Sequence, residues 1–274
     1  MTLNQWLIAA CGKIDSDEAM VEARWLLAYV TGLNPTQQRI HDPELSTSQQ
    51  QHLNQLLARR LNGEPLAYLV EHQPFYTLDL AVNQHTLIPR ADSECLLETT
   101  LGCLKGCPTP LVADLGTGSG ALALAVAQTR PDAQVIASDR SLEALRVANI
   151  NAVRHQITNV AFILGDWLEP LADSAFDVIM SNPPYIADDD PHLTSLSYEP
   201  YSALVAAEQG YADLKHLIDH AARALKPGGW LLLEHGFEQA AKLRELAQNR
   251  ALWQQISTVQ DHGGRDRVTL MQRS

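Results

Sequence analysis

The spacing of apolar residues changes along the chain, and its first part has the period of a helix. Apolar side chains recur every three or four positions from Ala19 to Val30 and again from Leu53 to Leu61. Capping signals precede these runs at residues 15–18 and 47–50, and a glycine follows each run. The pattern predicts amphipathic helices that pack on one another. It does not distinguish a plain helical cap from a partner-docking domain.

A short connecting region follows these helices. Residues 75–82 alternate between apolar and polar side chains, which predicts a hairpin. The segment 87–90 then leads into a helix capped by Asp92 or Ser93. We interpret this region as a linker into a second domain.

Beyond Pro110 short apolar strands alternate with helices. The predicted strands cover 111–115, 134–138, 160–164, 176–181, 230–234, 253–258 and 267–271. The predicted helices cover 121–128, 142–153, 211–225 and 238–248. This alternation predicts an α/β fold with a doubly wound, mostly parallel seven-stranded sheet covered on both faces. Only a short turn separates the last two strands, so we expect an antiparallel last strand.

Composition and charge narrow the class of protein. Hydrophobic residues make up 46% of the 274 residues and charged residues 19%, which is typical of a globular protein. No apolar stretch approaches the ~18 residues of a membrane span, and the N-terminal apolar patch is too short for a secretory signal. We therefore expect a cytoplasmic protein with no membrane partner. The net charge of −12, without a cluster of Lys and Arg, argues against direct nucleic-acid binding. Four cysteines without a C-x-x-C pair give no reason to expect a metal site.

A glycine-rich turn joins the first strand of the second domain to its first helix. It reads Asp114-Leu115-Gly116-Thr117-Gly118-Ser119-Gly120, at the junction where doubly wound folds bind ligands. Glycines at alternate positions let the backbone approach a ligand closely. The third glycine comes one position too early for the dinucleotide fingerprint G-x-G-x-x-G. This mismatch counts against NAD and favours another ligand that contains adenosine.

Acidic residues follow the next two strands. Asp139 ends the second strand, where a carboxylate can accept both hydrogen bonds of a ribose diol. The alternative for Asp139 is a helix N-cap, a role that Ser141 can also fill. Asp166 and Trp167 follow the third strand and are candidates for contacts to an adenine, whereas a core position is the alternative for Trp167. The order of these residues along the strands favours an adenosine-containing ligand.

The segment Asn182-Pro183-Pro184-Tyr185 follows the fourth strand. The prolines fix φ and carry no N–H, which leaves the Asn182 side-chain oxygen and the Pro183 carbonyl as rigidly held acceptors. Such acceptors suit a substrate NH2 group, and Tyr185 adds a flat face for a planar amide or base. A conjugated nitrogen attacks poorly because its lone pair is delocalised. Holding both of its N–H groups would align it with a methyl donor and stabilise the growing positive charge.

The two motifs together resemble the class I, Rossmann-like methyltransferases of the N-P-P-Y type, which use S-adenosylmethionine. Four further segments are similar to the PrmC/HemK family, namely residues 63–68, 87–94, 199–204 and 232–236. The resemblance covers nearly the whole chain. It implies methylation of N5 of the glutamine in the Gly-Gly-Gln motif of class I peptide chain release factors. It also implies a helical substrate-recognition domain at 1–72, a hairpin linker at 73–90 and a methyltransferase domain at 91–274.

The resemblance assigns roles to individual residues. The cofactor-binding candidates are Asp114, Gly116, Thr117, Gly118, Ser119, Gly120, Asp139, Asp166, Trp167 and Asn182. The catalytic candidates are Asn182, Pro183 and Tyr185. The substrate-binding candidates are Asn182, Pro183, Pro184, Tyr185 and Arg90, and a surface salt bridge is the alternative for Arg90. The chain departs from the family pattern at Glu71, Ala91 and Ala206-Ala207, which bears on local geometry and partner affinity.

Three other functions compete with this interpretation. A ribosomal-protein glutamine methyltransferase shares the chemistry, but residues 87–94 argue against it because that paralogue has a different sequence after its Pro-Arg. A DNA or RNA adenine-N6 methyltransferase would need a basic groove. A binding module without catalysis is disfavoured by the intact segment 182–185.

Overall fold

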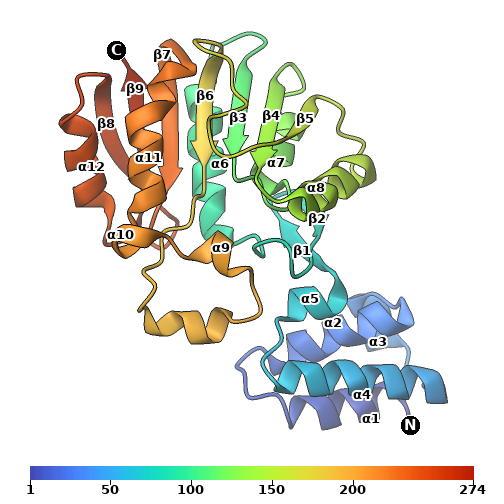
Figure 1. Cartoon of the computed structure of the whole chain (residues 1–274). Coiled ribbons are helices and arrows are strands. Elements are labelled where there is room, and N and C mark those ends of the chain that lie inside the picture. The colour runs from blue at the N-terminus through green and yellow to red at the C-terminus, as the bar shows by residue number, and fades with distance from the viewer. The chain divides into compact units, whose positions relative to one another are not determined.

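The computed structural model describes residues 1–274, which divide into two compact units, Met1–His72 and Gln73–Ser274 (Figure 1). The first unit is helical, and the second is built around a β-sheet. No helix in either unit is both long and apolar enough to span a lipid bilayer.

Five helices make up the first unit: α1 (Leu3–Cys11), α2 (Ala19–Thr31), α3 (Pro35–Ile40), α4 (Thr47–Leu61) and α5 (Leu66–Val70). Leu26 and Leu27 of α2 pack with Leu53 and Leu57 of α4 in one buried cluster. Each fully buried leucine stabilises the fold by roughly 1.5–3 kcal/mol relative to an exposed one. The predicted helical spacing is confirmed in α2 and α4, except that Leu61 is 48% exposed.

The ends of these helices differ in detail from the predicted ones. Helix α4 is capped by Ser46, whose hydroxyl accepts from the Gln49 N–H, so the cap lies one residue before Thr47. No side chain caps α2. Helix α5 ends at Glu71 with φ +60°, in the left-handed region that favours glycine. The glutamate at this position therefore places backbone strain at the end of α5.

A seven-stranded sheet in the order β5-β4-β3-β6-β7-β9-β8 forms the centre of the second unit (Figure 1). Its strands are β3 (Leu111–Leu115), β4 (Gln134–Asp139), β5 (Val160–Leu164), β6 (Phe176–Ser181), β7 (Leu225–Glu234), β8 (Trp253–Gln260) and β9 (Asp266–Arg273). Strands β3 to β7 pair in parallel, whereas β9 runs antiparallel to both of its neighbours. The predicted α/β class and the mostly parallel, Rossmann-like sheet with an antiparallel last strand are confirmed.

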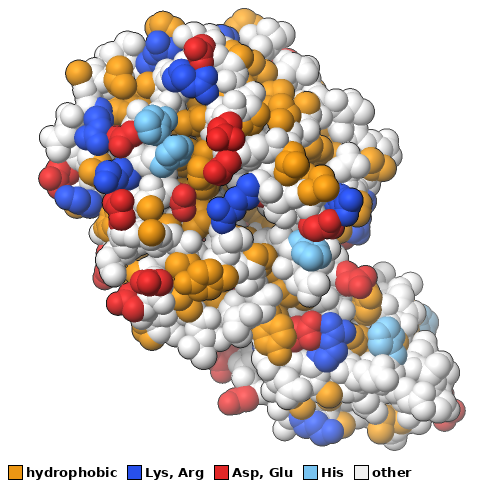
Figure 2. Space-filling model, in the orientation of Figure 1, with side chains coloured by type: hydrophobic (Ala, Val, Ile, Leu, Met, Phe, Trp, Pro, Cys, Tyr) orange, Lys and Arg blue, Asp and Glu red, His pale blue; other side chains and the backbone are white.

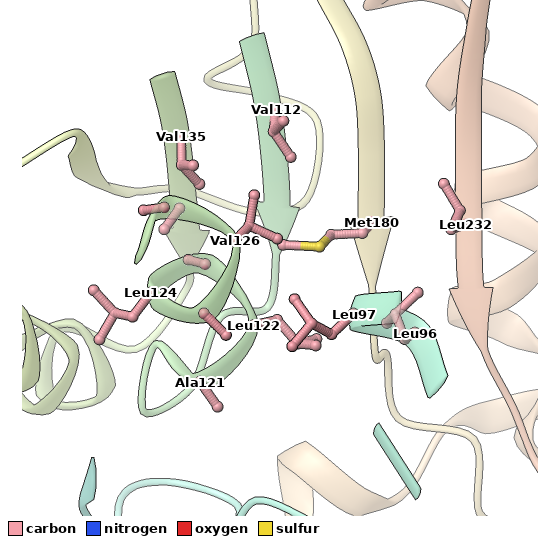
Figure 3. Packing of buried hydrophobic residues seen from close by; sticks show 14 of the residues in the cluster. Leu96, Leu97, Val112, Ala121, Leu122, Leu124, Val126, Val135, Met180 and Leu232 are labelled. Atoms are coloured by element: carbon pink, nitrogen blue, oxygen red, sulfur yellow. The ribbon is translucent and has the colours of Figure 1, made fainter. Parts of the chain in front are cut away.

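Helices cover both faces of this sheet. Those on one face are α6 (Glu94–Cys103), α7 (Ala121–Thr129) and α8 (Leu142–Arg154). Those on the other face are α11 (Ala212–His220) and α12 (Ala240–Gln248). Neighbouring strand residues alternate between the two cores, as the pleat requires: Val112 lies in the first and Ala113 in the second. Figure 3 shows Val126 of α7 pointing toward Met180 of β6 in the first core.

The predicted helix over 211–225 is wrong at its end. Helix α11 stops at His220 and continues only as the 3-10 turn η3 (Ala221–Arg223). The Arg223 guanidinium donates to the carbonyls of Leu168 and Leu171, and Leu225 already pairs with Phe176 at the start of β7. Strand β7 therefore begins before the predicted Trp230, with a register shift opposite β6.

Shorter elements complete the second unit: the hairpin strands β1 (His72–Phe75) and β2 (Leu78–Ala81), η1 (Ala91–Ser93), η2 (Pro191–Leu196), α9 (Tyr201–Leu204) and α10 (Ala207–Gly210). The buried Asn151 of α8 joins the hairpin to the glycine-rich turn. Its side chain accepts from the Ala81 N–H at 2.6 Å and donates to the carbonyls of Ala81 and Ser119 at 3.0 and 2.9 Å.

Replacing Asn151 tests this link. Asn151→Ala leaves one N–H and two carbonyls without their partner, and we expect the free energy of unfolding to fall by about 3 kcal/mol. Asn149→Ala is the control because Asn149 is exposed on the same helix, and it should change stability by less than about 0.5 kcal/mol. Urea unfolding monitored by circular dichroism measures both values. Equal stability of the two variants would show that the link is unimportant.

Candidate active site

The carboxyl ends of four parallel strands bring four loops to one edge of the sheet. Strand β3 lies between β4 and β6, so Leu115 pairs with Ser138 on one side and Ser181 on the other. After β3 the chain forms β4 on one side of β3, and it later returns to form β6 on the other side. Doubly wound sheets bind ligands at such a switch point. A cavity of about 330 Å³ opens there, a size within the range of small-molecule sites.

Most of the predicted site residues line this cavity. Those that do are Arg90, Gly116, Thr117, Gly118, Ser119, Asp139, Asp166, Trp167, Asn182 and Pro184. The lining does not include Asp114, Gly120, Pro183 and Tyr185. The first group borders the space that a ligand would occupy, whereas the second group does not.

The carboxylate of Asp139 joins the glycine-rich turn to the exit of β4. Its Oδ2 accepts from the Gly118 N–H at 2.9 Å, and its Oδ1 accepts from the Ser141 N–H at 2.8 Å. Ser141 caps α8, since its hydroxyl accepts from the Ala144 N–H. The helix-cap alternative for Asp139 is therefore excluded, and its carboxylate lines the cavity.

The turn itself depends on glycine. Gly116, Gly118 and Gly120 all have positive φ. At Gly120, with φ +83°, a Cβ would also lie 3.1 Å from the Cβ of Ala148 in α8. Only glycine combines this backbone conformation with so close an approach of two helices. The spacing of the three glycines therefore reflects both the turn and the packing behind it.

Asp114 holds the turn from a buried position. Its Oδ2 accepts from the Thr117 hydroxyl at 2.6 Å and from the Ala123 N–H at 3.2 Å, while its buried Oδ1 has no hydrogen-bond partner. Burial raises the pKa of Asp114 to about 7, although both hydrogen bonds act in the opposite direction. The carboxyl therefore holds the turn from behind the cavity, whose lining does not include it.

Trp167 forms a flat wall of the cavity. A Cβ placed on Gly116 would lie 3.4 Å from its six-membered ring. The neighbouring Asp213 also lines the cavity, and burial raises the pKa of its carboxyl. The backbone of Trp167 has φ +43°, an uncommon conformation for a large side chain that is found mainly at functional sites. The aromatic face of Trp167 therefore lies beside the glycine-rich turn.

The side-chain amide of Asn182 is oriented by a serine. Its Nδ2 donates to the Ser93 hydroxyl oxygen at 3.2 Å, and both residues line the cavity. Ser93 was a predicted helix cap, and it does occupy the N-cap position of α6, but its side chain caps nothing. Since the nitrogen of the Asn182 amide is held by Ser93, the amide oxygen is the atom left to accept a hydrogen bond from a ligand.

The aromatic ring of Tyr185 lies in the core between β7 and the loops. Its hydroxyl donates to Glu234 Oε1 at 3.5 Å, and burial raises the pKa of the phenol. Its carbonyl accepts from the Gln239 side chain at 3.1 Å. Gly210 lies so close that a Cβ there would be 2.2 Å from the same carbonyl oxygen. The loop that carries Asn182 is therefore held at its backbone as well as by its prolines.

Arg90 forms an ion pair beside the cavity. Its guanidinium donates to Glu199, whose side chain is only 2% exposed, and the other oxygen of Glu199 accepts from the Ile88 N–H at 2.9 Å. This pair joins the segments 87–94 and 199–204. The salt-bridge alternative for Arg90 is thus present, but with a buried partner and beside the cavity.

Comparison with known proteins decides the family. Residues 111–272 match the family described as methyltransferase domain, and residues 2–70 match the PrmC N-terminal domain. The chain is 45% identical over 273 residues to the release factor glutamine methyltransferase of Salmonella typhimurium, with 98% of each chain covered. The protein of the same name from Escherichia coli K12 is 42% identical over 274 residues, again with 98% of each covered. The chain belongs to the release factor glutamine methyltransferase family.

A solved structure of a methyltransferase from Pyrococcus furiosus shares the fold of this family. It is 19% identical, covers 79% of this chain and 96% of its own, and superposes with a TM-score of 0.52. This likeness confirms the Rossmann-like methyltransferase fold that the sequence predicts.

Several residues of this family member's site were not predicted from the sequence. The sequence indicates Ser93 only as a helix cap and Glu199 and Glu234 only as parts of a resemblance, and it does not point to Gln239. Glu234 carries a signal that was available: it is an acidic residue directly after an apolar strand, as Asp139 is. Gln239 has no such signal because its partners, Tyr185 and Gly210, are distant in sequence.

Gly210 provides a test of how tightly the loop is held. We expect Gly210→Ala to lower the free energy of unfolding by about 3 kcal/mol, because strain at φ +83° is combined with overlap on the Tyr185 carbonyl. Gly264→Ala is the matched control: its φ is +75° with no atom within 4 Å of the added Cβ, so it should cost only about 1 kcal/mol. Urea unfolding compares them, and equal losses would contradict the close contact.

Proposed function

We propose that this protein transfers a methyl group from S-adenosylmethionine to N5 of the glutamine in the Gly-Gly-Gln motif of class I peptide chain release factors. The observation that carries the proposal is the Asn182 amide, which lies at the cavity edge with its nitrogen held by Ser93 and its oxygen left to accept. The names of its relatives favour a release factor as the substrate.

The cavity residues suit S-adenosylmethionine. The cavity has a volume of about 330 Å³, which is adequate for a small cofactor. The Asp139 carboxylate would accept the hydrogen bonds of the ribose, with Asp166 and Trp167 beside the adenine. The cofactor is cationic, and three carboxylates line the cavity, those of Asp139, Asp166 and Asp213. The unpaired Oδ1 of Asp114 adds a buried acceptor behind the turn.

When bound, the cofactor supplies a methyl group on a positively charged sulfur, which is already a good leaving group. The task of the protein is then to activate the amide nitrogen of the glutamine, whose lone pair is delocalised. Asn182 Oδ1 and the Pro183 carbonyl would accept its two N–H groups and hold it in one orientation. Both acceptors also stabilise positive charge that grows on this nitrogen. The proton leaves after transfer, so no strong base is required beforehand.

The remaining predicted residues have supporting roles in this proposal. Pro184 would shape the wall beside the target amide, and Tyr185 would hold the loop from the core. Arg90, through its buried partner Glu199, would fix the two segments at the mouth where the release factor enters. We infer that the helical residues 1–72 help to recognise the release factor, which the match to the PrmC N-terminal domain supports. Residues 73–90 would link them to the methyltransferase domain at 91–274.

The charge of the molecule favours a protein substrate over a nucleic acid. The net charge is −12, and on the face drawn in Figure 2 the Lys and Arg side chains are interspersed with Asp and Glu. Nucleic-acid binding draws most of its affinity from clustered cations that meet phosphates. A cytoplasmic location, expected from the sequence, agrees with a partner that acts in translation and stays a prediction.

Transfer of labelled methyl groups tests the proposal. The protein is incubated with S-adenosylmethionine labelled in its methyl group and with a purified release factor, its Gly-Gly-Gln→Gly-Gly-Ala variant, ribosomal protein or duplex DNA. We expect label in the intact release factor only, because only that substrate offers the glutamine of the Gly-Gly-Gln motif. Undiminished label in the Gly-Gly-Ala variant, or label in ribosomal protein or DNA, would refute the proposal.

Two substitutions should separate turnover from cofactor binding. Asn182→Ala removes the side-chain acceptor for the target amide, so kcat should fall at least ~100-fold while the Kd of S-adenosylmethionine stays within about twofold. Asp139→Asn removes a charged acceptor, so the cofactor Kd should rise about tenfold or more. Calorimetry and initial rates provide the two readouts. Normal turnover in Asn182→Ala, or unchanged cofactor affinity in Asp139→Asn, would contradict the assigned role.

A further inference from the structure

The polar side chains of the segment 90–94 bind four separate parts of the second unit. Their partners are the Glu199 carboxylate for Arg90, the Arg267 guanidinium for Asp92, the Asn182 amide for Ser93 and the Tyr76 N–H for Glu94. The sequence predicts Asp92 or Ser93 as a cap of α6, but no side chain caps this helix. The segment therefore connects Asn182 to parts of the fold that lie outside the cavity lining.

Arg267 of β9 is a rigid anchor for this segment. Its side chain is buried, Nε and Nη2 each donate to Asp261 Oδ2 at 3.2 Å, and Nη1 donates to the His235 carbonyl at 3.3 Å. The His235 N–H in turn donates to the Arg267 carbonyl at 3.0 Å. The end of β7 and the turn between β8 and β9 therefore hold the guanidinium in one place.

Asp92 is a second carboxylate on this guanidinium. Its Oδ2 lies 3.0 Å from Arg267 Nη2. A buried guanidinium needs an anionic partner, and the buried Asp261 already provides one. The Asp92 side chain is 52% exposed, so water can solvate its charge without Arg267. The ion pair with Asp92 is thus not required to neutralise Arg267, and its effect is to hold the turn η1 on a buried anchor.

The residue after Asp92 contacts the candidate catalytic amide. Ser93 Oγ accepts from Asn182 Nδ2 at 3.2 Å, at the long end of the usual range for an N–H···O hydrogen bond. A displacement of η1 by a few tenths of an ångström away from Asn182 would break this bond. The Asn182 amide could then rotate and turn its NH2 group toward the substrate, where a donor opposes the N–H groups of the target glutamine.

We propose that Arg267 and Asp92 are positioning residues: their ion pair fixes Ser93, which keeps the oxygen of the Asn182 amide toward the substrate. The proposal rests on the proposed function, in which Asn182 Oδ1 accepts from the amide nitrogen of the target glutamine. It assigns neither Arg267 nor Asp92 a contact with the cofactor or the substrate.

A double-mutant cycle in the full chain tests the proposal. Asp92→Ala removes one ion pair and leaves Arg267 with Asp261, so kcat should fall about tenfold while the cofactor Kd stays within about twofold. Ser93→Ala should lower kcat by a similar factor. Because Asp92 acts through Ser93, the double variant should also lose about tenfold, and not the roughly hundredfold that independent effects would give.

Two further variants separate positioning from general packing. Asp92→Asn should recover most of the lost kcat, because its amide oxygen can still accept from Arg267. Glu98→Ala is the matched control. Glu98 joins α6 to the same turn between β8 and β9 through His262, at 3.6 Å, but it lies more than a helical turn beyond Ser93. Its loss should leave kcat within about twofold.

A second readout is independent of methyl transfer. In protein labelled with 15N-asparagine, the side-chain NH2 signals of Asn182 are identified by their loss in Asn182→Ala. These signals should shift in Asp92→Ala and in Ser93→Ala, because both variants release the amide nitrogen from Ser93. They should stay in place in Glu98→Ala.

Four outcomes overturn the proposal: normal kcat in Asp92→Ala, losses that multiply in the double variant, an Asp92→Asn variant as slow as Asp92→Ala, or a cofactor affinity that falls in parallel with turnover. Should Asp92→Ala fail to fold, Asp92→Ser replaces it, since serine is also too short for the ion pair but stays polar. Failure of the wild type to methylate a release factor would instead refute the proposed function, and the Asn182 signals would still test the link to Asp92.

Discussion

The parallel pairing of β3 with β4 on one side and β6 on the other is the interaction on which the candidate site depends. It places Leu115 between Ser138 and Ser181, so the loops that follow these strands begin at the same level of the sheet. The glycine-rich turn, the Asp139 carboxylate and the Asn182 amide therefore meet although long stretches of chain separate them. A slip in either register would move one loop away from the others.

Around this framework, buried polar contacts restrict the loops more than their own sequences do. The prolines limit the loop after β6, but its place is set by Ser93, Gln239 and Glu234. Such groups are expensive to bury unless they are paired. Their concentration behind Asn182, together with the unusual backbone of Trp167, matches the expectation that strain and buried charge gather at functional sites. A rigid acceptor is what an unreactive amide nitrogen requires.

The sequence predicts the elements well where one local signal dominates. Strands β3, β5 and β6 have the predicted ends, because each is a short apolar run between turn signals. The helix predicted to Leu225 fails because the alanines after His220 continue the apolar period, while Arg223 and the pairing of Leu225 with Phe176 end the helix. Tertiary contacts outweigh local propensity there.

The residues of the candidate site also differ in how well the sequence predicts them. Residues that follow strands directly, such as Asp139 and Asn182, are predictable because topology brings strand ends together. Ser93 and Gln239 are not, since their partners lie 89 and 54 residues away. Of the predicted residues, Asp114, Gly120, Pro183 and Tyr185 lie outside the cavity lining, a distinction that depends on how the loops pack.

The most direct test of this account is a crystal structure of the protein with S-adenosylhomocysteine and a peptide that contains the Gly-Gly-Gln motif. The account predicts that the glutamine amide nitrogen donates to Asn182 Oδ1 and to the Pro183 carbonyl, with Asn182 Nδ2 still on Ser93. A glutamine bound away from residues 182–185, or an Asn182 amide with its NH2 group toward the substrate, would contradict it.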